Sequence, residues 1–433
     1  MLLCRKMKGG GEAIKRRGVY LYSLVLCCLL LSLLASAGCW DRREPSFLGV
    51  VTAVAFDYDP QTELLQVIAE VANPLGISAG EGGGQNGGGG GAEMPFWVVE
   101  TSGHTIYEAI KKTEQISTRK LIWSHLEVVL FSEAMAKRGL RPVLDYIDRE
   151  RQARLIARPF VVQGDIRKLM GAEFPLEQLG GTALIRQLLT LRLEDAVVPE
   201  IDSLRRLFHH LSVPGVELLL PCIEVEVGKE EGGGGGGGDE GKTRRPGPAK
   251  ISGAALFRGD KLAGFFDEKE TAGYLWLTNN IRRLTMVFPP PGEGGDGENK
   301  DNKFLTVEVF WAANKLQQEV QGEKVRVHLF VQAEARLQDY GGQDLSQAEE
   351  FKRSLNRRLA TVIHNQIGMA WRKARFLNLD VFGFGHELYK TRPQDWRRLE
   401  KKWAGIFPEI ELEVDVRTLI RSYGLVAKPI TVR

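Results

Sequence analysis

Ser346-Gln347-Ala348-Glu349 begins a long helical pattern that lies between predicted strands, and this order sets the fold of the second half of the chain. Ser346 and Glu349 form a capping box, which satisfies free N–H groups in the first turn of a helix. Helical spacing then continues to about Phe376. One face of the predicted helix is apolar and carries Phe351, Leu355, Leu359, Val362, Ile363, Ile367 and Trp371. We expect this face to lie across a sheet.

Strands with a period of two lie on both sides of this helix. Their apolar positions are Leu305, Val307, Val309 and Trp311, then Val325, Val327, Leu329 and Val331, and later Ile410, Leu412, Val414 and Val416. A period of two with one apolar face is typical of antiparallel sheets that face water on one side. The sequence therefore predicts a C-terminal domain with an antiparallel sheet packed by the long helix.

The first half alternates between helical and strand patterns. Residues 48–55 and 64–71 predict a hairpin with its turn at Asp57-Tyr58-Asp59-Pro60. Further helices are expected at 105–114, 132–139, 142–150 and 165–170, and further strands at 126–131, 155–162 and 218–227. Ser132 and Asp165 are the expected N-caps. This alternation favours a mixed α/β domain, and the two halves together predict the α+β class.

Two glycine-rich segments interrupt the chain. Residues 80–91 cannot bury a core and are interpreted as a surface insertion. Residues 232–238, followed by Arg244-Arg245-Pro246-Gly247-Pro248, are typical of a linker between domains. The predicted division is 1–38 for a signal peptide, 39–228 for an N-terminal domain with a possible split near 170–210, 229–250 for the linker, and 251–433 for a C-terminal domain.

The second glycine-rich segment matches a nucleotide-binding pattern by composition alone. Gly236 to Thr243 satisfies G-x-x-x-x-G-K-[ST], but phosphate binding needs that loop to lead directly into a helix. Pro246 and Pro248 prevent such a helix. We therefore expect no nucleotide or other cofactor at this segment.

The N-terminus has the layout of an export signal. Six basic residues precede an apolar run without charge from Gly18 to Gly38. Ala37-Gly38-Cys39 then resembles the end of a bacterial lipobox, with Ser36 at the position where leucine is usual. In a lipobox the cysteine is lipidated and the chain is cleaved before it, here between Gly38 and Cys39. The alternative is an uncleaved membrane helix, because about 20 apolar residues can span a bilayer. Both interpretations put the rest of the chain outside the cytoplasm.

Charge and cysteine content limit the function of the mature chain. Without residues 1–38, the remaining 395 residues carry 52 basic and 54 acidic side chains, so no electrostatic argument supports nucleic acid as a partner. Of five cysteines only Cys222 remains besides Cys39 and those of the leader. Cys222 is therefore predicted to be a buried apolar residue without a disulfide partner.

At Cys39-Trp40-Asp41-Arg42-Arg43-Glu44 the sequence resembles the Ger(x)C family, the lipoprotein C subunits of nutrient germinant receptors in spore-forming bacteria. Similar blocks are 125–131 with 138–142, 253–257 with 262–265, and Asp380-Val381-Phe382-Gly383-Phe384-Gly385 with Trp396, Trp403, Phe407 and Pro408. The resemblance implies an elongated, multidomain, mixed α/β protein at the outer face of the spore inner membrane. It also implies integral membrane partners, the A- and B-type receptor subunits, and a part in sensing nutrients.

The family blocks also have a direct physical interpretation. Gly383 and Gly385 allow a backbone turn that Asp380 can cap, whereas phosphate binding would need a third glycine three residues later. Trp396 and Trp403 fall on one helical face beside basic residues. That face is predicted to pack in the core, with docking on lipid headgroups as the alternative.

These observations favour a non-enzymatic, lipid-anchored receptor subunit that works through protein contacts, with no metal site and no catalytic residues. An extracytoplasmic solute-binding lipoprotein is the alternative, and it would need two doubly wound lobes. An exported hydrolase is a third possibility. The chain has seven histidines but neither H-E-x-x-H nor G-x-S-x-G, and the side chains of the adjacent His209 and His210 would diverge on a helix.

Overall fold

The structure is a computed structural model of the whole chain. It describes residues 22–29, 47–73, 96–172, 174, 176–194, 198–199, 201, 203–225, 249–289, 304–339 and 348–422. The chain divides into two compact units, Met1–Leu48 and Gly49–Arg433. In the first unit, residues 22–29 of the apolar run are helical. Within the described ranges, no helix is both long enough and apolar enough to cross a membrane.

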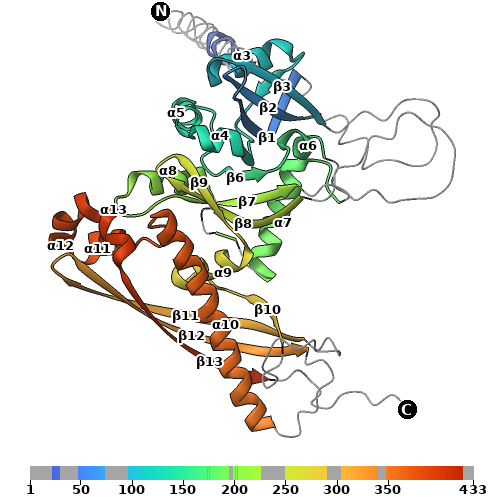
Figure 1. Cartoon of the computed structure of the whole chain (residues 1–433). Helices are drawn as coiled ribbons and strands as arrows, with labels where there is room; N and C mark the ends of the chain where they lie inside the picture. Colours follow the sequence, from blue (N-terminus) through green and yellow to red (C-terminus); the bar gives the residue numbers. More distant parts are fainter. Residues whose placement is uncertain are drawn as a thin grey trace, which may run out of the picture. The chain divides into compact units, whose positions relative to one another are not determined.

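The first sheet has nine strands in the order β3-β2-β1-β5-β6-β7-β8-β9, with β4 paired to β1 (Figure 1). Its strands are β1 Leu48–Asp59, β2 Leu64–Ala72, β3 Phe96–Gly103, β4 Lys120–Ile122, β5 Val128–Ser132, β6 Arg158–Gln163, β7 Leu219–Val225, β8 Ala249–Arg258 and β9 Lys261–Phe266. The central strands β1, β5, β6 and β7 run parallel. Antiparallel pairs extend the sheet at both edges.

Helices cover both faces of this sheet. The helices α3 Ile106–Ile116, α4 Glu133–Arg138, α5 Arg141–Arg149 and α8 Leu204–Ser212 share one core, and α6 Ile166–Met170 and α7 Gly180–Glu194 share the other. Alternate side chains of β5 enter opposite cores, because Val129 belongs to the first and Leu130 to the second. The predicted caps are confirmed, since Ser132 caps α4 and Asp165 caps α6.

A buried carboxylate that the sequence analysis missed joins β2 to α7. Glu70 is 2% exposed, and its Oε2 accepts a hydrogen bond from the N–H of Gly180 (2.8 Å). Oε1 accepts from the Thr52 hydroxyl (2.6 Å) and from the N–H of Gly181 (3.2 Å). A negative charge at the first turn of a helix is also favoured by the helix dipole. Glu70 therefore fastens α7 to the sheet.

Glu70→Gln is expected to lower the free energy of unfolding by about 1–3 kcal/mol, because the new amide group cannot accept from Gly180 and leaves one buried N–H without an acceptor. Urea unfolding measures the change. The control is Glu63→Gln, at an exposed position of the β1–β2 turn. Equal stability of both variants and the unmodified chain would contradict the role assigned to Glu70.

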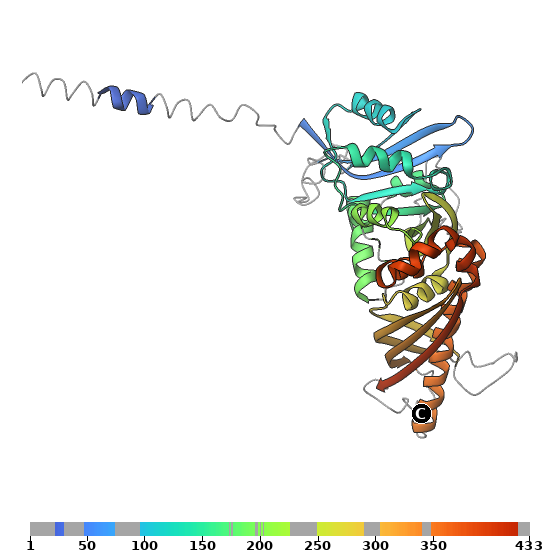
Figure 2. The same ribbon diagram turned by 90° about the vertical axis from the view of Figure 1, so that its left-hand side faces the viewer.

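The second sheet has the order β10-β11-β12-β13, and the long helix covers it as predicted. Its strands are β10 Leu284–Phe288, β11 Leu305–Gln321, β12 Lys324–Asp339 and β13 Glu411–Ser422. The long helix is α10, Ala348–Leu377, and it lies along β11–β13 (Figure 1 and Figure 2). Leu355, Leu359 and Ile363 of α10 are fully buried in one core with alternate residues of the sheet. A shorter helix, α9 Glu268–Leu277, belongs to the same core.

The prediction of an entirely antiparallel C-terminal sheet is wrong for its last strand. β10, β11 and β12 pair antiparallel, but β13 is parallel to β12, with Leu329 opposite Val414. The cause is the connection, because α10 and the short helices after it return the chain to the starting end of β12 before β13 begins. The alternation of apolar residues correctly predicted which face of β13 packs in the core. It carries no information about the direction of the strand.

The predicted linker connects two neighbouring strands of one sheet. β7 ends at Val225 and β8 begins at Ala249, and these two residues face each other in the antiparallel pair. The β8–β9 hairpin, predicted as the start of the C-terminal domain, therefore extends the first sheet. Leu219 and Leu256 of that sheet also belong to the core of the second sheet. The domain boundaries of the sequence analysis stay a prediction.

Several predicted features lie outside the described residues. They are the insertion at 80–91, the nucleotide-like pattern at 236–243, and the first two residues of the capping box, Ser346 and Gln347. The sequence predicts a possible subdomain split near residues 170–210. Two helices of that region, α7 and α8, pack on opposite faces of the same sheet.

Candidate functional site

Asp380 organises the turn that follows α10. Its Oδ1 accepts hydrogen bonds from the N–H groups of Gly383 (2.9 Å) and Phe384 (3.0 Å). Its Oδ2 accepts from the N–H of Gly385 (2.8 Å) and from Nε1–H of Trp403 (3.0 Å). We call residues 380–386 the Asp380 turn. It leads into α11, Phe384–Thr391.

The Asp380 carboxyl is buried, at 5% exposure, and burial raises its pKa to about 6. The four hydrogen bonds oppose this shift, because every donor faces the carboxylate and favours its charged form. The ionised group is therefore held by donors from both sides in a site that water does not reach.

The two glycines of the turn are needed for different physical reasons. Gly383 has a φ of 75°, in the left-handed region that other residues adopt at a cost. A Cβ at Gly385 would lie 2.7 Å from the Trp396 ring and 2.8 Å from Nε1 of Trp403. The two glycines thus form the turn that the sequence predicted. The Trp396 and Trp403 rings occupy the space that a side chain at position 385 would need.

Trp396 and Trp403 pack in the core, which is the first of the two alternatives given for them. They are 3% and 7% exposed, and their ring centroids are 5.3 Å apart in an edge-to-face arrangement. They come from two short helices, α12 Pro393–Leu399 and α13 Trp403–Ile406. Docking of these two rings on lipid headgroups is therefore wrong.

The Asp380 turn also binds the segment between α8 and β7, residues 213–217. The N–H of His386 donates to the carbonyl of Gly215 (2.8 Å), and the N–H of Glu217 donates to the carbonyl of Asp380 (2.9 Å). Gly215 has a φ of 74°, and a Cβ there would lie 2.5 Å from the carbonyl carbon of Gly385. The turn thus fastens the helices of the second sheet to a connection of the first. Sequence analysis missed Gly215, although Pro214-Gly215 is a turn signal.

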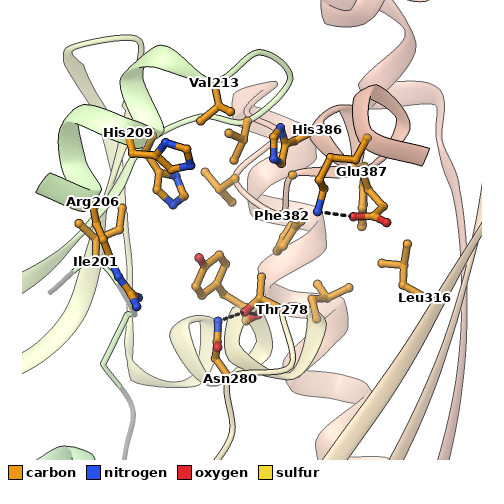
Figure 3. A pocket seen from close by; sticks show the side chains of 18 of the residues that line it. Ile201, Arg206, His209, Val213, Thr278, Asn280, Leu316, Phe382, His386 and Glu387 are labelled. Atoms are coloured by element: carbon orange, nitrogen blue, oxygen red, sulfur yellow. Dashed lines mark hydrogen bonds and ion pairs between the residues drawn. The ribbon is translucent and has the colours of Figure 1, made fainter. Parts of the chain in front are cut away.

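A pocket of about 470 Å³ opens beside the Asp380 turn (Figure 3). One wall comes from α8 and the segment after it, with Arg206, His209, His210, Val213 and Val216. The rest comes from α9 and the residues just after it, the middle of β11, the Asp380 turn and α11. These elements include Tyr274, Leu277, Thr278, Asn280, Leu316, Phe382, His386, Glu387 and Lys390. Its size is in the usual range for small-molecule sites.

His209 and His210 both line this pocket, with ring centroids 6.4 Å apart. The sequence predicts that their side chains diverge on a helix, and the two rings are perpendicular to each other, yet both line the same pocket.

Among the residues that the structure describes, no group of three or more His, Cys, Asp or Glu side chains could hold a metal ion. Cys222 is buried, as predicted, and burial raises the pKa of its thiol. A thiol in that state is a poor nucleophile.

The predicted anchor and the first family block cannot be located. Gly38, Cys39, Trp40, Asp41, Arg42 and Glu44 lie outside the described residues. Their roles, and the functional role of Asp380, Gly383, Gly385, Trp396 and Trp403, stay predictions.

Comparison with known families accounts for most of the chain. Residues 41–225 match the family model "Spore germination protein N-terminal domain", and residues 252–424 match "Spore germination B3/ GerAC like, C-terminal". The chain belongs to the Ger(x)C family of spore germination proteins. The resemblance noted in the sequence is thereby confirmed, as is the multidomain α+β fold.

Individual Ger(x)C relatives match over nearly the full length. Spore germination protein KC of Bacillus subtilis (strain 168) is 24% identical over 423 residues, which covers 94% of this chain and 97% of the relative. Spore germination protein YndF of the same organism is 23% identical over 437 residues, covering 93% and 97%. The relatives' names support a role for this chain in spore germination.

A solved structure, the crystal structure of the GerBC protein, has a similar fold. Its TM-score is 0.52 at 15% sequence identity, and the match covers 88% of this chain and 99% of the GerBC chain. At this identity the similarity concerns the fold alone.

Proposed function

We propose that this chain is the lipid-anchored C subunit of a spore nutrient germinant receptor. A diacylglycerol on Cys39 holds it at the outer face of the spore inner membrane, where it contacts the integral membrane A- and B-type subunits. The observation that carries the proposal is the pair of family models, which follow one another along the chain and begin at residue 41, two residues after Cys39. Two acyl chains hold a protein firmly at a membrane, because each buried methylene contributes about 0.8 kcal/mol.

The fold differs from the two-lobed fold of the solute-binding class considered above. A solute-binding protein of the type considered above needs two doubly wound lobes. Here the first sheet has helices on both faces, whereas the strands of the second alternate between buried and exposed residues, so helices cover one of its faces. The Asp380 turn joins the helices of the second sheet to the first sheet. A displacement imposed by a partner on one sheet is therefore carried to the other through the turn.

Cys39→Ala is expected to remove the acyl chains completely, because the thiol is their attachment point, so the variant should not have the mass of residues 39–433 plus acyl chains. Intact mass of the protein from the membrane and soluble fractions of the native host measures this effect. The matched control is Cys28→Ala, a cysteine of the apolar run that is exposed in the structure. The unmodified chain and this control should both have the mass of residues 39–433 plus acyl chains.

If the unmodified chain retains residues 1–38 in its mass, the anchor is contradicted and a membrane helix is favoured. If the lipid is present but no A- or B-type subunit co-purifies from spore membranes, the receptor assignment fails while the lipoprotein assignment holds.

A further inference from the structure

The pocket beside the Asp380 turn gathers basic side chains from two elements that are far apart in the sequence. α8 supplies Arg206, His209 and His210, and α11 supplies His386 and Lys390. Glu387 is the one carboxylate among its lining residues, and it forms an ion pair with Lys390 (2.8 Å). The lining holds two cationic side chains, Arg206 and Lys390, and the single carboxylate of Glu387, so it carries net positive charge even with its histidines neutral. Positive charge in a concave space favours an anion.

The surroundings of His386 lower the pKa of its imidazole, through burial first and the charge of Lys390 second. Its Nδ1 lies 3.3 Å from the carbonyl oxygen of Pro214. A neutral ring in this position donates from Nδ1 to Pro214, since a ring lone pair would repel the carbonyl. The ring therefore contributes a hydrogen-bonding group to the pocket rather than a charge.

The rest of the lining is largely apolar. Leu277, Leu316, Phe382 and Val213 contribute hydrocarbon or ring surface. The polar groups at the end of α9 are already engaged, because the Asn280 side chain donates to the Thr278 hydroxyl (3.1 Å). In Figure 3, Arg206 and His209 lie on one side of the space. Phe382 and Leu316 lie on the other side together with Glu387, whose carboxylate is paired with Lys390. Because that carboxylate is already paired, this arrangement suits a molecule with one charged end and one apolar end.

We propose that this pocket binds a small organic carboxylate that carries an apolar group. The carboxylate lies toward Arg206 and His209 on α8, and the apolar group lies against Leu316 and Phe382. A ligand in this position touches α8 and the Asp380 turn together, so its binding strengthens the same junction that the turn forms. The proposal does not depend on lipidation of Cys39 or on a receptor complex.

The test is a calorimetric titration of the full chain in detergent with phenylacetate. Phenylacetamide has nearly the same shape without the charge, and inorganic phosphate is an anion without an apolar group. We expect saturable binding of phenylacetate, at least about tenfold tighter than that of either comparison compound, because a charge-assisted hydrogen bond is lost with the amide and apolar contact is lost with phosphate.

The variant is Arg206→Gln, and its matched control is Arg205→Gln. Both arginines are exposed on α8, but Arg205 does not line the pocket. We expect Arg206→Gln to weaken phenylacetate binding about tenfold or more and Arg205→Gln to leave it unchanged. His209→Gln, also at an exposed position, provides a second variant with a smaller expected loss. Thermal unfolding of each variant checks that it is folded.

Three results would overturn the proposal. They are no saturable binding of phenylacetate up to about 10 mM, equal binding of phenylacetamide or phosphate, and an equal loss in the Arg205→Gln control. A loss confined to Arg206→Gln and His209→Gln supports it.

Discussion

Asp380→Asn is expected to lower the free energy of unfolding by about 3–5 kcal/mol, one of the two largest effects of a single substitution that we predict for this chain. All four groups that contact the carboxylate are donors: the N–H groups of Gly383, Phe384 and Gly385, and the Trp403 indole. Asparagine has only one oxygen, so its NH₂ group would face two donors. Those two buried donors would then have no acceptor, and the turn would have to open.

The same carboxyl predicts a distinctive pH dependence. Its pKa is about 6 in the folded chain, against 3.8 as the ordinary value. The folded state therefore binds the proton more tightly, and the stability contributed by this group is fully present below about pH 4 and is lost as the pH rises toward 6. The difference between the two pKa values corresponds to about 3 kcal/mol. The contribution stops changing only above about pH 7, where the folded chain has also lost the proton.

Urea unfolding at several pH values between 4 and 7 measures both effects, on the unmodified chain and on Asp380→Asn. Between about pH 4 and 6 the unmodified chain should lose stability relative to the variant, which has no carboxyl to titrate. Asp145→Asn, at an exposed position of α5, is the control and should follow the unmodified chain. Parallel curves for the unmodified chain and Asp380→Asn would mean that the carboxyl is not perturbed by burial.

Features encoded by neighbouring residues were predictable from the sequence. Ser132, Gly139 and Asp165 delimit helices because a cap acts within one turn, and the apolar stripe of α10 repeats within the helix itself. The turn at Asp380 belongs largely to the same class, since three of its four donors lie within five residues of the acceptor, whereas the fourth, Trp403, lies 23 residues away. Local patterns of this kind need no knowledge of the rest of the fold.

Features that depend on contacts between distant segments were not predictable. Glu70 caps a helix that begins 110 residues later, and a glutamate in a strand pattern carries no sign of such a partner. The direction of β13 depends on where α10 and the later helices return the chain, which alternation does not record. The pocket likewise depends on α8 and α11 coming together, although both its histidine pair and the Gly383–Gly385 block were visible in the sequence.

Residues 213–217 and the Asp380 turn form such a contact between distant segments, and Gly215→Ala should show how much this junction contributes to stability. We expect a loss of about 3–4 kcal/mol in the free energy of unfolding. Alanine at a φ of 74° costs about 1–2 kcal/mol by itself. In addition, its Cβ would lie 2.5 Å from the Gly385 carbonyl carbon and 2.6 Å from the His386 nitrogen, and backbone atoms cannot rotate away as a flexible side chain can.

Gly322→Ala separates these two costs. Gly322 has a φ of 66°, but nothing lies within 4 Å of the position where a Cβ would be. This control therefore carries the backbone cost alone, and urea unfolding should show about 1–2 kcal/mol for it. An equal loss in Gly215→Ala and Gly322→Ala would mean that the close contact with the turn contributes nothing. If the contact does matter, the loss in the double variant Gly215→Ala/Asp380→Asn should be smaller than the sum of the two single losses. Once either change has opened the junction, the other has less left to disrupt.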